Sequence, residues 1–201
     1  MLKEQSNSQY LISKLLKEGS ELFKFGGRIA KLLFMEDAFN INEKIDISVS
    51  RANLGELLRL IPHQYHAKGF DAKRTSYDLN ELDVKTLRCV NIYYGPTLII
   101  AIGVYDVIDD EWLFRMDDNI RLPEKYIYYH SLKWDVDYIK PEIVLMYELL
   151  DPMVQPLQPP SFREVIDSLS YFQYVLLRTV VGQDRIEAAV CLLYTSDAAD
   201  E

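Results

Sequence analysis

The sequence has 201 residues, of which 49% are hydrophobic and 26% charged, and its 22 Lys and Arg against 31 Asp and Glu give a net charge of −9. This composition is typical of a globular chain of one or two domains, and it excludes disordered, collagen-like and disulfide-framed chains. An acidic chain without a run of Lys or Arg has little with which to neutralise phosphates in bulk, so we expect neither a nucleic acid nor a membrane as partner.

The sequence also bears on the compartment. No apolar stretch approaches the roughly 20 residues of a membrane span, and residues 1–5 carry no signal-peptide core. The cysteines are Cys89 and Cys191. If Cys191 is not native, one thiol is left, which cannot form an internal disulfide or a cysteine metal cluster. We therefore expect a cytoplasmic protein.

The last eleven residues resemble a cloning or sequencing scar. Residues 191–201 read CLLYTSDAADE, which is similar to the translation of a sequencing-library transposon adapter. Such a tail is excluded from reasoning about the fold. We expect residues 191–201 to be non-native, and the native chain to be truncated near Val190.

Periodicity in the first 61 residues predicts a helix, a short apolar segment, a second helix, a strand and a third helix. Apolar residues recur at helical spacing over residues 8–22, and again from Ile29 after the pair Gly26-Gly27. Residues 44–49 alternate between polar and apolar side chains, which is typical of a strand that buries one face. Leucines then recur at helical spacing up to Pro62, which ends the helix.

The middle of the chain predicts a β-hairpin, and the C-terminal part predicts helices. Residues 89–93 and 97–108 are apolar and β-branched, and a Tyr-Gly-Pro turn separates them. A Pro-Glu start predicts a helix over residues 141–150. Ser161 and Glu164 match a capping box, which predicts a further helix as far as about residue 181.

The fold class expected from these elements is α+β. We expect an α+β domain over residues 1–135 and a helical C-terminal part over residues 136–190, because the sequence pattern changes at residue 135 from mixed strands and helices to helices. The tail, residues 191–201, stands outside both parts.

The order of the double glycine, the helix and the strand is the feature that points to chemistry. It resembles the nucleotidyltransferase fold, whose motif is a Gly-Gly or Gly-Ser turn followed by a strand reading Asp-hydrophobic-Asp-hydrophobic, with a third carboxylate on a later strand. Residues 111–115, 120–123 and 138–147 are similar to the equivalent stretches of the aminoglycoside and lincosamide nucleotidyltransferases. The resemblance covers roughly residues 20–150.

The resemblance implies a fold, an activity and a set of site residues. The fold is a twisted mixed sheet flanked by helices, with a helical C-terminal part. The activity is transfer of a nucleoside monophosphate from a nucleoside triphosphate, above all ATP, to a hydroxyl of a small acceptor such as an antibiotic, with Mg²⁺. Asp46 would be the catalytic metal ligand, Gly26 and Gly27 the phosphate turn, and Arg28 and Lys44 further groups near the phosphates.

The sequence departs from the motif at its carboxylates. Residues i and i+2 of a strand share a face, so two aspartates one residue apart can hold Mg²⁺ together. Here the partner of Asp46 is Lys44 or, in the alternative register, Ser48, and the third position falls near Ala101. Asp106 is the one charged candidate on the later strand, so Asp46 and Asp106 are the expected metal ligands.

Alternatives follow from this departure. An ammonium about 4 Å from a divalent ion would repel it by roughly 8 kcal/mol at an effective dielectric of about 20. Lys44 either supplies charge to a phosphate or forms a surface ion pair with Asp46, and the double glycine is either a phosphate turn or an ordinary tight turn. The alternative function is a catalytically impaired relative that binds a nucleotide or a protein partner.

Overall fold

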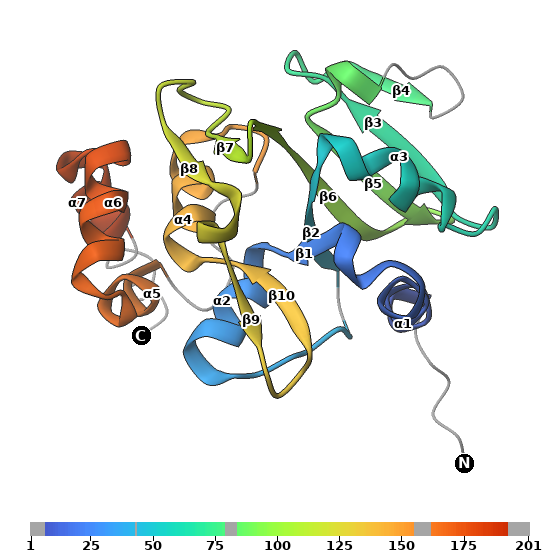
Figure 1. The fold of residues 1–201 in the computed structure, drawn as a ribbon, viewed down its shortest axis with the longest axis horizontal. Helices are drawn as coiled ribbons and strands as arrows, with labels where there is room; N and C mark the ends of the chain where they lie inside the picture. The colour runs from blue at the N-terminus through green and yellow to red at the C-terminus, as the bar shows by residue number, and fades with distance from the viewer. Residues whose placement is uncertain (1–6, 43, 79–83, 155–161, 193–201) are drawn as a thin grey trace.

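The computed structural model describes residues 7–42, 44–78, 84–154 and 162–192. Its helices flank one large sheet (Figure 1). The α-helices are α1 (Asn7–Gly19), α2 (Gly27–Glu36), α3 (Arg51–Arg59), α4 (Pro141–Leu150), α5 (Phe162–Ser168), α6 (Tyr171–Val181) and α7 (Gln183–Leu192). Short 3-10 helices are η1 (Ser20–Leu22), η3 (Val84–Thr86) and η4 (Glu124–Tyr126).

The strands of the described residues join in a mixed sheet. They are β1 (Phe23–Phe25), β2 (Ile45–Ser50), β3 (His66–Phe70), β4 (Ser76–Asp78), β5 (Cys89–Tyr94), β6 (Thr97–Ile108), β7 (Glu111–Leu113), β8 (Arg121–Pro123), β9 (Tyr128–Ser131) and β10 (Val136–Ile139). Their order is β4-β3-β5-β6-β2-β1-β10-β9, and β7 pairs with β6 and β8. The pairs β2–β6 and β1–β10 are parallel, and the other pairs are antiparallel. The expected α+β fold, a mixed sheet flanked by helices, is confirmed.

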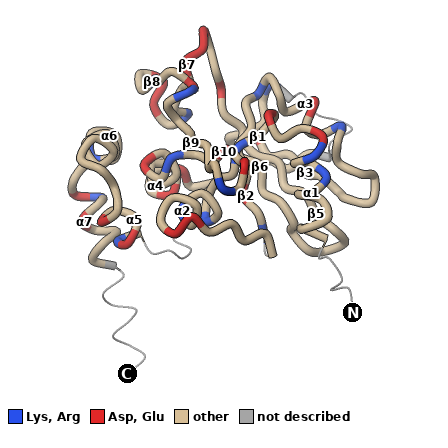
Figure 2. The backbone as a smooth tube through the Cα atoms, turned by 60° about the horizontal axis from the view of Figure 1, so that its bottom comes forward, with Lys and Arg blue, Asp and Glu red and all other residues tan. Residues whose placement is uncertain are grey.

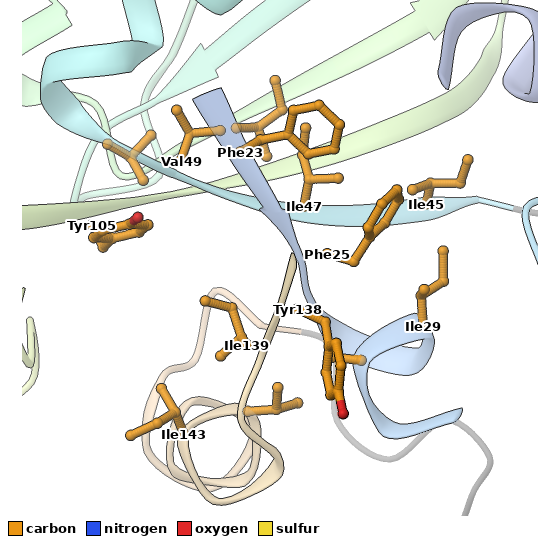
Figure 3. Close-up of a cluster of buried hydrophobic side chains, with 14 of the residues drawn as sticks. Phe23, Phe25, Ile29, Ile45, Ile47, Val49, Tyr105, Tyr138, Ile139 and Ile143 are labelled. Carbon is orange, nitrogen blue, oxygen red and sulfur yellow. The ribbon is translucent and has the colours of Figure 1, made fainter. Parts of the chain in front are cut away.

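Polar and apolar residues alternate along β2, which gives this central strand one buried face. Ile45, Ile47 and Val49 are buried, while the polar residues between them point to the opposite face. Figure 3 shows Phe23 and Phe25 of β1 beside these residues. Buried apolar side chains on both neighbouring strands fix the register, because a shift of one residue would turn them to the other face.

The C-terminal part differs from the expectation in two places. β10 pairs with β1 and β9, so the sheet extends past the boundary expected at residue 135. The helix expected as far as residue 181 is two helices, α5 and α6, and the second begins with a capping box between Ser170 and Gln173. Ser161, expected to cap this region, lies outside the described residues, as do residues 193–201 of the tail.

Helices α5, α6 and α7 gather at one end of the molecule, far from β3 and β4 (Figure 1). A buried hydrogen bond connects α6 to α4. In it, the Gln173 side-chain amide donates to Glu142 Oε2 at 2.7 Å. Burial raises the pKa of the Glu142 carboxyl, and this hydrogen bond opposes the rise. Within the described part of the chain, no helix is both long and apolar enough to cross a bilayer.

Candidate functional site

A cavity of about 420 Å³ lies where the start of α2 meets the sheet and α4. Its walls come from the β1–α2 corner, from β2, β5 and β6, and from α4. Five of the six residues expected at the site line this cavity: Gly26, Gly27, Arg28, Lys44 and Asp46. The structure therefore brings together residues from two segments that a whole helix separates in the sequence.

At the double glycine, the backbone before α2 comes close to β2. The Gly26 N–H donates to the Asp46 carbonyl at 2.8 Å, and Gly27 has a φ of +49°. A Cβ on Gly27 would lie 2.6 Å from Asp46 Oδ2, and one on Gly26 would lie 3.2 Å from Ser48 Oγ. Both positions therefore favour glycine, and Gly27 does so because of its positive φ as well.

This corner is also the N-terminus of α2. Gly26 is the N-cap, so no side chain caps the helix. The first backbone N–H groups of a helix have no partner within it, and the helix dipole places partial positive charge there. The corner can therefore bind an anionic group.

Lys44 and Asp46 form an ion pair, which is one of the two roles considered for Lys44. Lys44 Nζ lies 3.1 Å from Asp46 Oδ1, and the two side chains are 27% and 26% exposed. The carboxylate thus faces the glycine corner on one side and an ammonium group on the other. Ser48, the alternative partner of Asp46, lines the same cavity.

A second carboxylate of the cavity, Glu148 of α4, was not singled out in the sequence. Its side chain is 5% exposed, and its Oε1 lies 2.9 Å from the Nζ of Lys31, a wholly buried residue of α2. Its Oε2 has no hydrogen-bond partner among the described residues. Burial raises the pKa of the Glu148 carboxyl; Lys31 opposes this rise and Asp46 adds to it.

Only a weak feature of the sequence could have pointed to this pair. Lys31 and Glu148 each interrupt an apolar run, and a charged residue inside such a run is buried only when it has a partner. Nothing in the sequence says that each is the partner of the other.

Two arginines also line the cavity. Arg115 forms a buried ion pair with Asp151, and its guanidinium lies 4.8 Å from the centre of the Tyr147 ring. Arg74 donates to the Pro152 carbonyl. With Arg28 and Lys44, the cavity is lined by four cationic side chains and by the two carboxylates of Asp46 and Glu148, and ion pairs hold two of the cations, Lys44 and Arg115.

This lining contrasts with the chain as a whole. Figure 2 shows basic and acidic segments interspersed along the tube, and the whole chain carries a net charge of −9. The cavity is locally cationic within an acidic protein, so its field favours an anionic ligand.

Asp106, the other expected metal ligand, lies elsewhere. It binds Arg51, whose Nε is 2.5 Å from Asp106 Oδ1, and it does not line the cavity. The β6 residue paired with Asp46 is Ala101. Asp106 stands five residues further along that strand, which is about 17 Å at the usual rise per residue.

The residues present therefore do not fit a two-metal site. Among the described residues, no three His, Cys, Asp or Glu side chains gather closely enough to hold a metal ion. Asp46 and Asp106 are not brought to one ion, and each carboxylate of the cavity is already paired with a lysine. The expected Mg²⁺ ligands are not assembled.

No protein-family model matches the chain, and no curated protein is similar enough in sequence to match it. Two solved structures align with it over most of its length. The crystal structure of ANT(2'')-Ia in complex with adenylyl-2''-tobramycin is 15% identical, with a TM-score of 0.47, and the alignment covers 93% of this chain and 97% of that chain. The solution structure of the antibiotic-resistance factor ANT(2'')-Ia is 15% identical, with a TM-score of 0.44, and the alignment covers 94% of this chain and 92% of that chain. At these values the likeness carries no argument about chemistry, which we take from the residues of this chain.

Proposed function

We propose that the chain is a nucleotidyltransferase-like protein that binds a nucleoside triphosphate in this cavity, with the phosphates at the Gly26-Gly27 corner. One observation carries the proposal: an uncapped helix N-terminus, bare of side chains at both glycines, opens onto a wall with four cationic side chains and two carboxylates. Backbone N–H groups and a cationic wall together are what a polyphosphate requires.

The rest of the cavity suits the remainder of a nucleotide. Part of its lining is apolar and includes Ile102, Val104 and Ile143. Tyr147 lines it as well, with the Arg115 guanidinium over its ring. Ligand sites typically combine a mostly apolar lining with a few polar groups that fix orientation.

Calorimetric titration with each of the four common nucleoside triphosphates tests the proposal. We expect binding, with ATP the first choice, and we expect Lys44→Gln to weaken it at least about tenfold, or about 1.4 kcal/mol. The matched control is Lys17→Gln, which removes an equal charge from an exposed position on α1 outside the cavity. Absence of heat with every triphosphate would refute the proposal.

A second candidate function is transfer of the nucleoside monophosphate to a hydroxyl of a small acceptor. One observation favours it: Glu148, whose buried Oε2 has no hydrogen-bond partner among the described residues, is a carboxylate of the same cavity. In that reaction the acceptor oxygen would bond to the α-phosphorus, its proton would pass to Glu148, and pyrophosphate would leave. Incubating labelled ATP with panels of aminoglycosides and lincosamides tests this candidate, and product that disappears in Glu148→Gln supports it.

A further inference from the structure

We infer that nucleotide binding in this cavity does not depend on a divalent cation, because the Lys44 ammonium stands where a metal ion would meet Asp46. The inference rests on the proposed function, since it concerns how the same site meets the charge of the phosphates. According to this inference, cationic groups of the protein balance the charge of the phosphates in place of Mg²⁺.

The charge around Asp46 disfavours a divalent cation. Lys44 Nζ lies 3.1 Å from Asp46 Oδ1. A divalent ion bound to this carboxylate would be attracted by the adjacent negative charge and repelled by the ammonium group a few ångströms further away. The repulsion offsets part of the attraction, so Asp46 holds such an ion less tightly than an unpaired carboxylate would.

Around Asp46, the other carboxylate positions of the motif hold Lys44 or Ser48 and Ala101, none of which adds negative charge. Ala101 is the β6 residue that pairs with Asp46, and it carries no polar group. Glu148, the other carboxylate of the cavity, is paired with Lys31. Mg²⁺ prefers an octahedral set of oxygen ligands and is usually held by one or two carboxylates plus phosphates. Both carboxylates of this cavity are already neutralised by lysines.

The protein can supply the missing positive charge itself. An ammonium group carries three donors, so Lys44 can hold Asp46 and still donate to a phosphate oxygen. Its side chain is 27% exposed and lines the cavity, so a ligand can reach it. The N–H groups at the start of α2 lie at the adjoining corner. A charge-assisted donor and backbone amides then hold the phosphates together.

Titration of the wild-type chain with ATP, once in EDTA and once in excess Mg²⁺, tests the inference directly. We expect the dissociation constant in EDTA to lie within about threefold of that in Mg²⁺, or to be lower. Binding that is more than about tenfold weaker in EDTA would overturn the inference and leave the proposed function standing. Absence of binding in both buffers would instead refute the proposed function.

Two variants of the ion pair give results of opposite sign. We expect Lys44→Asp to weaken binding in EDTA by at least about tenfold, whereas Asp46→Asn, which retains Lys44, should bind ATP in EDTA at least as tightly as wild type. Lys17→Asp is the matched control for the charge reversal. If Mg²⁺ were required, Asp46→Asn would abolish binding and Lys44→Asp would strengthen it in Mg²⁺, and either result overturns the inference.

Discussion

Replacing Lys31 with methionine should lower the free energy of unfolding by about 3–5 kcal/mol, because it leaves the Glu148 carboxylate buried and without its partner. Lys31 is wholly buried and the Glu148 side chain is 5% exposed, so the carboxylate that remains is poorly hydrated. Urea unfolding measures the effect. The matched control is Lys14→Met, which breaks the exposed pair with Glu18 on α1 and should cost no more than about 0.5 kcal/mol.

The same variant should show a pH dependence of known sign. Burial already raises the pKa of Glu148, and loss of Lys31 removes a group that lowers it. The folded state then binds a proton more readily than the unfolded state, whose carboxyl has a pKa near 4.5. Stability of Lys31→Met should therefore fall as the pH rises from about 4.5 through the raised pKa of the folded state.

Removing the second charge as well should restore stability. The double variant Lys31→Met with Glu148→Met should recover most of the loss, because apolar side chains of similar volume can replace a buried ion pair at little cost. A double variant as unstable as Lys31→Met, or a loss that does not change between acidic and neutral pH, would contradict the burial of this pair.

Gly27→Ala is the second change with a large expected effect, on both stability and binding. The φ of +49° costs a residue with a Cβ about 1–2 kcal/mol. The new methyl group would also lie 2.6 Å from Asp46 Oδ2, so the carboxylate must move. We expect a loss of stability of at least that size and ATP binding weaker by about tenfold or more.

Gly55→Ala is the matched control for this substitution. Gly55 lies within α3, and a Cβ there would meet no atom within 4 Å. Alanine at such a helix position should stabilise the protein by about 0.5–1 kcal/mol and leave ATP binding unchanged. Equal stability of the two alanine variants, measured by urea unfolding, would show that the Gly27 corner is not strained.

Local patterns in the sequence were enough to predict the elements that form the glycine corner. Alternation over residues 44–49 predicted β2, and the double glycine predicted the turn before α2, because both patterns depend on near neighbours. The hairpin of β5 and β6 followed from two apolar runs around one turn. The short strands β9 and β10 escaped prediction, since four residues hold too little periodicity.

Long-range pairing was the part that the sequence could not supply. Lys31 and Glu148 are 117 residues apart, and only the packing of α2 against α4 brings them together. Asp106 was the one charged candidate on its strand, yet Arg51 from the start of α3 binds it away from the cavity. Charged side chains choose partners by tertiary position, which spacing along one strand does not reveal.

Backbone amide chemical shifts during a titration with ATP test most directly whether the phosphates bind at the glycine corner. The account predicts that the largest shifts fall on Gly27 and Arg28, because their N–H groups begin α2 where the phosphates are placed, and that the Gly55 amide does not move. Saturable binding that leaves the Gly27 and Arg28 amides unchanged and moves residues on α6 or α7 would contradict it.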